Sequence, residues 1–452
     1  MEIDPWASKG VKNYKEICDK FGLDMIDHTK LPNPTHLHRR GIIFAHRDLD
    51  NVFNARKAGK PFGVLSGLMP SGQIHLGHKM VIDQAKWFQE LGGDVTITVA
   101  DLEAHATRGL SLEKCRKYAI EEYISNYAGM GLDPDRTSIY FQSERPIVQK
   151  MGFTLGTKTN LSEMEAIYGF SGKTSLAHVQ SPLVQAGDIV HPQLDEFGGL
   201  RPIVVPVGID QDPHIRLTRG MVSKTNWFNV NQNNSGNLTI GLSIQDNNQE
   251  IMGMRNDGGV DKNQRKLIVD KVVSSISKAG FNQINSNPKH GTIDIKDATT
   301  DNQNEIRYQL LALERQLGGM GLMQPSSTYH QFAVGMTGGK MSSSQPETTM
   351  FLNDSMKDIQ KKIKSSFSGG QATVEEHRAK GGNPDVDVAY QYLRYFFEED
   401  DNKLENIRED YVSGKLLTGE IKSICIEKAS EWMKNHNELK DQNQHLIKDF
   451  LN

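Results

Sequence analysis

An alternation of short apolar runs with amphipathic helical patterns, beginning near residue 61, most constrains how this chain folds. The apolar run "PFGVLSG" leads through a glycine-rich loop into the helical pattern "HKMVIDQAKWFQELGG". The strand-like "DVTITVAD", the helical "SLEKCRKYAIEEYISNYAGMGLD" and the strand-like "SIYFQSE" follow. Such alternation is typical of parallel sheets with right-handed crossovers. We therefore expect an α/β fold with a doubly wound parallel sheet.

The rest of the chain adds a second half to this sheet and two further units. "RPIVVPVGIDQ" predicts another buried strand, and the helix after it starts at Asp212 and Pro213. From about Asn226 the composition shifts to Asn and Gln, and helix-like and strand-like patterns follow, which indicates an insertion with its own small α/β element. The chain after "GGKMSSSQPETTMFL" is helical throughout. We expect an N-terminal extension (1–60), a sheet domain in two parts (61–225 and 323–352), the insertion (226–322) and an all-helical domain (353–452).

Composition limits the class of protein without choosing a function. The chain has 452 residues, of which 37% are hydrophobic and 24% charged, and a net charge of −4. These values are ordinary for a water-soluble protein of about three domains, and no run approaches the roughly 20 apolar residues of a membrane span. The three cysteines have neither disulfide-framework nor metal-site spacing, and the N-terminus does not resemble a signal peptide. We expect a cytoplasmic protein.

The loop "SGLMPSGQIHLGHKM" is the first candidate for chemistry. It lies where the first strand of the sheet leads into its helix, which is where doubly wound folds bind anionic ligands. Gly72 and Gly77 allow the backbone to approach a nucleotide, and the helix start offers free N–H groups to phosphate. His75 and His78 are three residues apart, so both imidazoles point to one side. A single histidine here is usually a solvated or capping residue, but the pair suits two donors along a phosphate chain.

A second loop, "GGKMSSS" at residues 338–344, complements the first. Its two glycines allow movement, and Lys340 followed by three serine hydroxyls suits a pyrophosphate leaving group that must be bound and then released. Alone this segment is typical of a solvated linker. Its combination with His-x-Gly-His about 260 residues upstream, in an α/β context, favours a nucleotide site.

These two loops resemble the HIGH and KMSKS signatures of class I aminoacyl-tRNA synthetases. The resemblance implies a Rossmann-like catalytic domain that activates an amino acid with ATP and attaches it to the terminal adenosine of tRNA. "VPVGIDQDPHIRLTRGM" and the tail from "SGGQATVEEHRAKGGNPDVDVAYQY" onward resemble the tryptophanyl members of the archaeal and eukaryotic branch. The likeness covers most of residues 61–221 and 329–452, and the insertion lies outside it.

The amino-acid specificity depends on the segment "SPLVQAGDIV", which is similar to the specificity helix of tryptophanyl and tyrosyl enzymes. Asp188 falls where an aspartate accepts a hydrogen bond from the indole of tryptophan or the phenol of tyrosine, so it does not choose between them. Ser181 replaces a family tyrosine of the tyrosyl enzymes, which weighs against tyrosine. Leu65 and Thr98 depart from the Tyr and Gln of the eukaryotic tryptophanyl pocket, whereas Glu103 matches an acidic residue of that branch.

The resemblance implies L-tryptophan, ATP with its Mg²⁺, and tRNA(Trp) as substrates, no resident metal, no membrane, and a homodimer. Tyrosyl-tRNA synthetase is the alternative. A small-molecule nucleotidyltransferase would lack the second loop and the helical tail, and a non-catalytic tRNA-binding relative would be expected to have lost a histidine or the lysine. The expected site residues are catalytic His75, His78, Lys340, Ser342, Ser343 and Ser344, the ATP-binding Ser71, Gly72, Gly77, Gly208, Asp210 and Met341, and the amino-acid-binding Asp188, Gln185, Gln211 and Glu103.

Overall fold

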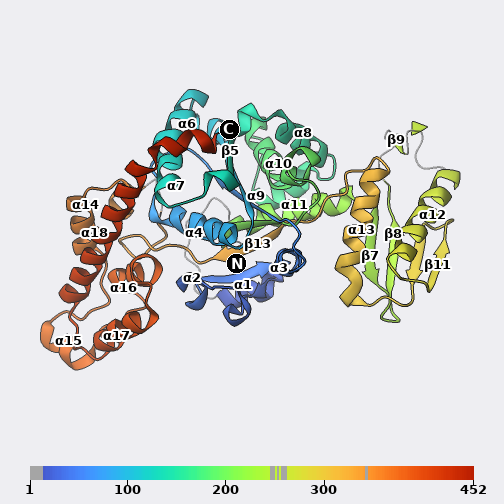
Figure 1. Cartoon of the computed structure of the whole chain (residues 1–452). Helices are drawn as coiled ribbons and strands as arrows, with labels where there is room; N and C mark the ends of the chain where they lie inside the picture. The colour runs from blue at the N-terminus through green and yellow to red at the C-terminus, as the bar shows by residue number, and fades with distance from the viewer. Residues whose placement is uncertain (1–13, 245–249, 252–253, 256–261, 342–344, 452) are drawn as a thin grey trace.

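The computed structural model describes residues 14–451 apart from 245–249, 252–253, 256–261 and 342–344. A seven-stranded sheet in the order β1-β2-β13-β6-β3-β4-β5 lies at the centre (Figure 1). Its five consecutive strands from β13 to β5 are parallel. The chain runs outward from β3 to β5 and then returns to β6 on the other side of β3, which makes the sheet doubly wound as predicted. The parallel strands are β3 (Gly63–Leu68), β4 (Asp94–Val99), β5 (Thr137–Phe141), β6 (Ile203–Gly208) and β13 (Ser326–His330).

The N-terminal segment extends the sheet at one edge, which the sequence patterns did not predict. Strand β2 (Ile43–Arg47) pairs antiparallel with β13, and the two-residue β1 (Asp24–Met25) pairs with β2. The fully buried Asp212 carboxylate joins these pieces, because it binds Arg47 at 3.0 Å and accepts a hydrogen bond from Tyr329 of β13 at 2.6 Å. Two strands before residue 61 therefore belong to the main sheet.

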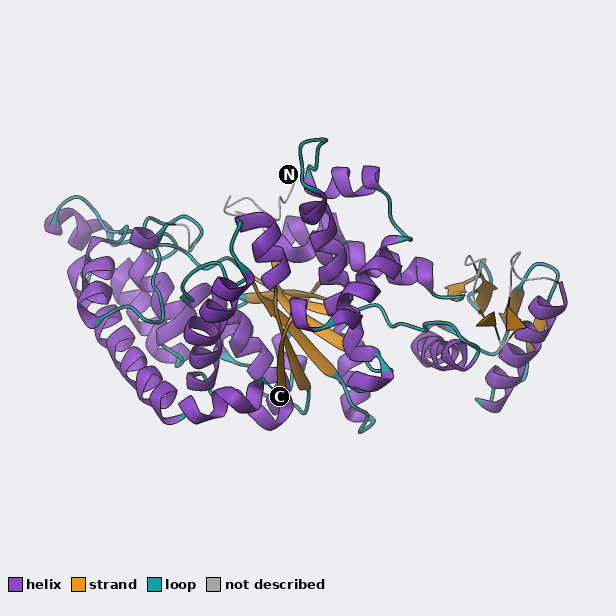
Figure 2. Ribbon diagram, turned by 90° about the horizontal axis from the view of Figure 1, so that it is seen from above, coloured by secondary structure: helices purple, strands orange, loops and turns teal. Residues whose placement is uncertain are grey.

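Helices cover both faces of the sheet (Figure 2). The pattern after "SLEKC" forms α6, a π-helical turn at Ala119–Ile124 and α7 in place of one continuous helix. Before and around the sheet the helices are α1 (Tyr14–Phe21), α2 (His36–Arg39), α3 (Leu49–Lys57), α4 (Leu76–Glu90), α5 (Asp101–Arg108), α6 (Leu112–Tyr118), α7 (Ser125–Gly129), α8 (Pro146–Gly156), α9 (Leu161–Tyr168), α10 (Leu176–Val190) and α11 (Asp212–Thr225).

The insertion forms a separate lobe at one end of the molecule (Figure 1). A four-stranded antiparallel sheet, β11-β12-β8-β7, packs against two helices around a core drawn from Trp227 to Leu317. The Asn-rich segment supplies the hairpin β7–β8, because its polar residues alternate with buried ones such as Val230 and Ile240. Since this core is its own, we propose that the insertion is an independent unit. Its elements are β7 (Phe228–Gln232), β8 (Leu238–Leu242), β9 (Glu250–Ile251), β10 (Met254–Arg255), α12 (Lys262–Lys278), β11 (Ile284–Asn287), β12 (Thr292–Ile295) and α13 (Gln303–Gln316).

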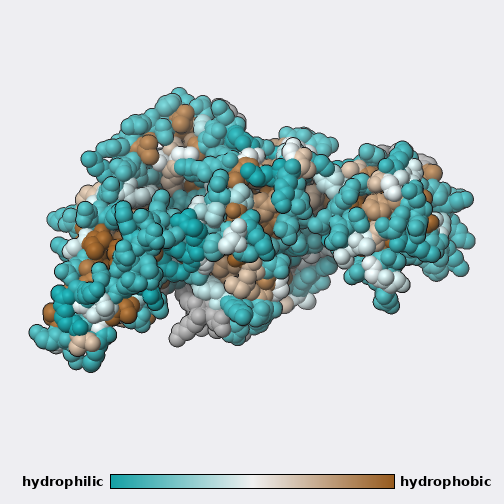
Figure 3. Space-filling view, turned by 60° about the horizontal axis from the view of Figure 1, so that its bottom comes forward, coloured by the Kyte–Doolittle hydropathy of each residue, from teal (hydrophilic) through white to brown (hydrophobic). Residues whose placement is uncertain are grey.

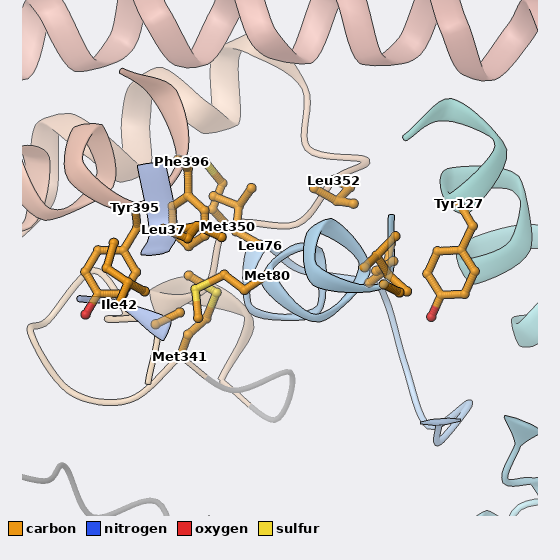
Figure 4. Close-up of a cluster of buried hydrophobic side chains, with 14 of the residues drawn as sticks. Leu37, Ile42, Leu76, Met80, Tyr127, Met341, Met350, Leu352, Tyr395 and Phe396 are labelled. Atoms are coloured by element: carbon orange, nitrogen blue, oxygen red, sulfur yellow. The ribbon is translucent and has the colours of Figure 1, made fainter. Parts of the chain in front are cut away.

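The chain after residue 353 is helical and lies at the opposite end of the molecule (Figure 1). Unlike the insertion, it shares a core with the sheet domain: Tyr395 and Phe396 belong to the same buried cluster as Leu37 and Leu76 (Figure 4). Its elements are α14 (Met356–Ser365), α15 (Val374–Lys380), α16 (Val388–Tyr392), a π-helical turn (Leu393–Phe397), α17 (Asp401–Val412), α18 (Thr418–Gln442) and α19 (Ile447–Phe450).

Specific polar contacts also fix the helical domain to the sheet domain. Arg39 and Arg40 of α2 both bind Asp401 of α17, at 2.6 and 2.7 Å. The long helix α18 returns to the sheet domain, where His436 Nε2 lies 2.7 Å from the Asn126 side-chain oxygen of α7. These contacts and the shared core predict that the helical domain and the sheet domain move together.

The surface is mostly hydrophilic, with scattered small apolar patches on the face that Figure 3 shows. Among the described residues, no helix combines the length and apolarity needed to cross a membrane.

Candidate functional site

A cavity of about 360 Å³ opens at the carboxyl ends of the parallel strands. Its walls come from the end of β3 and the residues after it, from β4, β6 and the residue after β5, and from helices α5, α10 and α11. This is the position where doubly wound sheets bind ligands, and the volume falls within the roughly 300–1,000 Å³ of small-molecule pockets.

Several residues that the sequence predicted for a site lie together around this cavity. They come from four separate segments of the chain, and the cavity also includes both positions where the sequence departs from the eukaryotic tryptophanyl pocket. The predicted site residues in its lining are Glu103, Gln185, Asp188, Gly208, Gln211 and Lys340, and the two departures are Leu65 and Thr98.

The two histidines cap helix α4. His75 is the N-cap residue, and its Nδ1 accepts a hydrogen bond from the Gly77 N–H at 3.1 Å. The Nδ1 of His78 accepts one from the His75 N–H at 3.1 Å, which completes a reciprocal cap. A Cβ on Gly77 would lie 2.9 Å from the His75 ring, so this fold-back of the ring requires glycine at that position. The cap explains the His-x-Gly-His spacing physically.

Burial keeps both rings neutral, and the caps decide which ring nitrogen carries the proton. Burial lowers the pKa of His75 well below 6.5, assisted by the neighbouring His78, and burial lowers the pKa of His78 to about 4. Both rings are therefore neutral near pH 7 and accept at Nδ1, so each carries its proton on Nε2. Their centroids are 3.9 Å apart. The pair presents two neutral N–H donors beside the positive end of α4, an arrangement suited to phosphate oxygens.

The segment that follows the second loop is joined directly to this helix start. The Leu76 N–H donates to the Met350 carbonyl at 3.2 Å, and the Leu352 N–H donates to the Ile74 carbonyl at 3.0 Å. The chain that leaves the Lys340 loop therefore pairs with the histidine loop. Its ammonium donates to Asp210 at 3.0 Å and lies 4.3 Å above the centre of the Phe332 ring. This places the predicted cation and the predicted ATP-binding carboxylate side by side.

The structure places the Met341 side chain of this loop, and it does not describe the three serines that follow it. The Met341 side chain is only 4% exposed and packs in the hydrophobic core beside Met80 (Figure 4). Its backbone N–H donates to the Ala333 carbonyl at 2.8 Å. Met341 is therefore an apolar anchor next to Lys340, and its predicted contact with ATP stays a prediction. The predicted Ser342–Ser344 lie outside the described residues.

The remaining predicted ATP-binding residues border the cavity without being part of its lining. Ser71 and Gly72 are partly exposed in the loop before α4, and the Ser71 N–H donates to the Met69 carbonyl at 2.8 Å. Gly77 lies in the cap of α4, and Asp210 lies in the short helical turn between β6 and α11, where it holds Lys340. Met69, Gly208 and Lys340, which line the cavity, connect these residues to it.

Asp188 lies at the buried end of the cavity with three hydrogen-bond donors. It is fully buried, its Oδ1 accepts from Thr98 Oγ1 at 3.1 Å and Tyr140 OH at 2.5 Å, and its Oδ2 accepts from Gln142 Nε2 at 2.5 Å. Burial raises the pKa of Asp188 to about 7, although these three hydrogen bonds act in the opposite direction. Its helix approaches α8 closely, since a Cβ on the preceding Gly187 would lie 2.2 Å from the Val148 carbonyl oxygen.

Glu103 is the second carboxyl group of the cavity. Burial and the nearby Asp188 charge raise the pKa of Glu103 to about 7, and Arg108 lowers it. A carboxyl group in a partly apolar cavity is a suitable partner for a substrate ammonium, because the ion pair forms in a medium that screens it weakly. The cavity thus combines a carboxylate for an amino group, buried acceptors for a side-chain donor and a lysine at its mouth.

Three cavity features went unpredicted by the sequence. Gln142 lines the cavity and binds Asp188, Tyr140 donates to Asp188 from behind, and Arg108 lies at the margin of the lining. Gln142 could have been found, because it is the polar residue that directly follows a buried strand, and such positions converge at the ligand-binding edge of a parallel sheet. The role of Tyr140 depends on the packing of α10 against β5, which local patterns do not encode.

Among the described residues, no group of three or more His, Cys, Asp or Glu side chains is arranged to hold a metal ion.

Comparison with known proteins agrees with this geometry. Residues 57–242 and 295–434 match the family model "tRNA synthetases class I (W and Y)". The chain is 38% identical to a tryptophan–tRNA ligase of Methanosarcina acetivorans, over 97% of this chain and 96% of that protein. It is 37% identical to a tryptophan–tRNA ligase of Archaeoglobus fulgidus, over 97% of both.

Solved structures show the same relationship. Tryptophanyl-tRNA synthetase of Aeropyrum pernix superposes with a TM-score of 0.72 at 32% identity, covering 99% of both chains. The Plasmodium falciparum enzyme superposes with a TM-score of 0.70 at 26% identity, covering 98% of this chain and 95% of that one. The family match, the full-length relatives and the shared fold together place this chain in the class I tRNA synthetase family, in its tryptophanyl and tyrosyl group.

Proposed function

We propose that this chain is a tryptophan–tRNA ligase. It activates L-tryptophan with ATP to tryptophanyl-adenylate, releases pyrophosphate and transfers the tryptophanyl group to the 3′-terminal adenosine of tRNA(Trp). The names of the archaeal relatives at 37–38% identity support this substrate. The observation that carries the proposal is the single cavity that brings Asp188 and Glu103 together with Lys340.

In this proposal the amino acid occupies the cavity with its side chain toward Asp188. Its ammonium binds Glu103, and Gln185 and Gln211 supply further polar contacts from the lining. The apolar walls, including Leu65 and Ile189, surround the indole. The carboxylate of the substrate then points toward the mouth, where Lys340 lies.

ATP would bind between the two loops, with Mg²⁺ carried on its phosphates. Ser71, Gly72 and Gly77 allow the phosphates to approach the start of α4, and Gly208 and Asp210 border the ribose. The tryptophan carboxylate attacks the α-phosphate in line and pyrophosphate leaves, so positioning and charge stabilisation supply the catalysis. The Nε2–H groups of His75 and His78 donate to the phosphates as negative charge shifts between them.

Lys340 would neutralise the departing pyrophosphate, and Ser342–Ser344 would donate hydrogen bonds to it. To do so Lys340 must exchange its ion pair with Asp210 for one with phosphate. The 3.0 Å contact therefore holds the ammonium near the site before ATP arrives, which reduces the ordering cost of the reaction.

We also propose that the helical domain binds the anticodon of tRNA(Trp), that the protein acts in the cytoplasm, and that it is a homodimer. Two large apolar side chains support an interface on the sheet domain: Phe153 of α8 is 75% exposed and Leu176 of α10 is 87% exposed. The two helices pack against each other, and a contiguous apolar surface on such a pair would be typical of a protein–protein contact.

Amino-acid-dependent ATP–pyrophosphate exchange, measured with each standard amino acid in turn, tests the proposed activity. We expect exchange with tryptophan and background exchange with the others. Exchange that depends on tyrosine would instead make the protein a tyrosyl enzyme, and the absence of exchange with every amino acid would refute an aminoacylating function.

A further inference from the structure

A buried hydrogen-bond acceptor without a partner lies in the wall of the amino-acid cavity. Gln142 directly follows β5, lines the cavity and is only 1% exposed. Its Nε2 donates to Asp188 at 2.5 Å, and its backbone carbonyl accepts from Gln149 Nε2 at 3.0 Å. Its Oε1 is buried and has no hydrogen-bond partner among the described residues. An unpaired buried acceptor costs free energy that a ligand donor would recover.

Asp188, in contrast, is already well supplied with donors. Thr98 and Tyr140 donate to its Oδ1, and Gln142 donates to its Oδ2. These contacts also fix the orientation of the Gln142 amide. With Asp188 ionised, the reverse orientation would place Oε1 against an Asp188 oxygen, so two acceptors would meet at hydrogen-bond distance without a proton between them. Oε1 therefore faces away from Asp188.

The groups behind Asp188 make this wall rigid. The Arg145 guanidinium stacks 3.9 Å from the centre of the Tyr140 ring, and Tyr140 in turn donates to Asp188. His191 Nδ1 lies 2.8 Å from the Asp188 carbonyl oxygen. Each member of the network has a partner except Gln142 Oε1, and a rigid wall with one open acceptor is well suited to read one substrate donor.

We propose that Gln142 Oε1 accepts the indole N–H hydrogen bond of tryptophan, and that Asp188 is a positioning residue that orients the Gln142 amide. This inference rests on the proposed function, because it takes tryptophan as the substrate. The indole nitrogen is a donor only, and the carbonyl end of an amide is an acceptor only, so the two match without any change of protonation.

The test compares tryptophan with an analogue that lacks the indole N–H, β-(3-benzothienyl)-L-alanine, in which sulfur replaces that nitrogen. The quantity measured is kcat/KM in ATP–pyrophosphate exchange. We expect the wild-type protein to prefer tryptophan by about tenfold or more, since the analogue leaves Oε1 unpaired. Gln142→Met keeps the length of the side chain and removes the acceptor. We expect this variant to lose the preference mainly through weaker use of tryptophan.

A preference that survives in Gln142→Met would overturn the proposal, because the acceptor would then be Asp188 or another group. Gln149→Met is the matched control: it removes a contact to the Gln142 backbone but leaves Oε1, and it should keep the preference. A role of Gln142 in stability alone would lower kcat/KM for both substrates equally and would also overturn the proposal.

If Gln142→Met does not fold, a crystal structure of the wild-type protein with tryptophan decides. An indole nitrogen within hydrogen-bond distance of Oε1 supports the proposal, and one bound to an Asp188 oxygen overturns it. Failure of the proposed function looks different from either result, because the wild-type protein would then show no tryptophan-dependent exchange.

Discussion

The ammonium of Lys340 has two partners in this structure, the Asp210 carboxylate and the Phe332 ring. Neither touches the buried end of the cavity where the amino-acid side chain is expected. The lysine and the amino-acid pocket are therefore separable by mutation, although they line the same cavity. Two predictions at the scale of single residues follow from this separation.

Lys340→Ala should slow adenylate formation by about 100-fold or more while changing the tryptophan dissociation constant little, because the contact with pyrophosphate forms chiefly in the transition state. Single-turnover adenylation and calorimetry measure the two quantities. Lys361→Ala, which removes an exposed lysine of α14, is the control and should change neither. Equal losses of rate and affinity in Lys340→Ala would contradict the assigned role.

The second prediction concerns pH. The pKa of Glu103 is raised to about 7 in the free protein, and only the ionised carboxylate pairs with a substrate ammonium. Below pH 7 tryptophan must displace a proton to bind, so its affinity should rise with pH up to about 7 and then level off. If Glu103 is the only group that titrates, the dissociation constant for tryptophan changes by up to about tenfold per pH unit at the acidic end of the range.

Titration calorimetry between about pH 5.5 and 8.5, on both sides of the raised Glu103 pKa, measures how the affinity for tryptophan depends on pH. Glu103→Gln should bind more weakly at pH 8 and should lose most of the slope. Any slope that remains belongs to Asp188, whose pKa is also raised to about 7. An unchanged slope in Glu103→Gln would show that this residue does not face the ammonium.

At the scale of elements, α4 contacts both the second loop, through Met341, and the segment that follows that loop. Backbone hydrogen bonds join Leu76 to Met350 and Ile74 to Leu352, and the Met341 side chain enters the core beside Met80 (Figure 4). The position of Lys340 relative to His75 therefore depends on an apolar anchor one residue away from it.

Met341→Ala should both destabilise the protein and impair the reaction. Removal of a buried methionine side chain costs about 2–5 kcal/mol, and loss of the anchor should displace Lys340 and lower the adenylation rate at least tenfold. Met433→Ala, a fully buried methionine of α18 in the same core, is the matched control. It should lose similar stability in denaturant melts while keeping the rate. Equal rates in the two variants would mean that the anchor does not position Lys340.

The sequence predicted the elements with strong periodicity and missed those that tertiary contacts stabilise. Strands β3 to β6 and helices α4 and α11 carry clear apolar patterns, and each lies close to where it was expected. Strand β13 reads "SSTYH", which has little hydrophobic character, yet all five residues are buried between two neighbouring strands. Its stability comes from pairing and from Tyr329, which donates to Asp212.

The same distinction holds within the candidate site. His75, His78 and Lys340 were predicted because short motifs place them, and Asp188, Gln185 and Gln211 because the resemblance places them. Gln142 and Tyr140 both donate hydrogen bonds to Asp188, which lies 46 and 48 residues further along the chain. Contacts of that kind depend on how α10 packs, so no local pattern contains them.

For the whole molecule, the exposed side chains of Phe153 and Leu176 allow a test of the proposed homodimer. The double substitution Phe153→Asp with Leu176→Asp should convert a dimer to a monomer in analytical ultracentrifugation, because it places charges in an apolar contact. Leu267→Asp, at an exposed apolar position of the insertion, is the control and should leave the dimer intact. A wild-type monomer, or a double variant that stays dimeric, would refute the proposed interface.

The three parts of the molecule differ in how closely they are coupled. The insertion has its own core, whereas the helical domain shares one with the sheet domain. The ion pair of Asp401 with Arg40 and the hydrogen bond between His436 and Asn126 also join the helical domain to the sheet domain. A helical domain fixed to the sheet domain keeps a constant distance from the cavity, which suits the anticodon binding that we propose for it.

Charging of tRNA tests the central claim most directly. Transcripts of tRNA(Trp) and tRNA(Tyr) would each be incubated with the protein, ATP and radiolabelled tryptophan or tyrosine, and acid-insoluble aminoacyl-tRNA would be counted. The account predicts that tryptophan is attached to tRNA(Trp) and that the other three combinations stay at background. Charging of tRNA(Tyr) with tyrosine, or no charging of tRNA(Trp) with tryptophan, would contradict it.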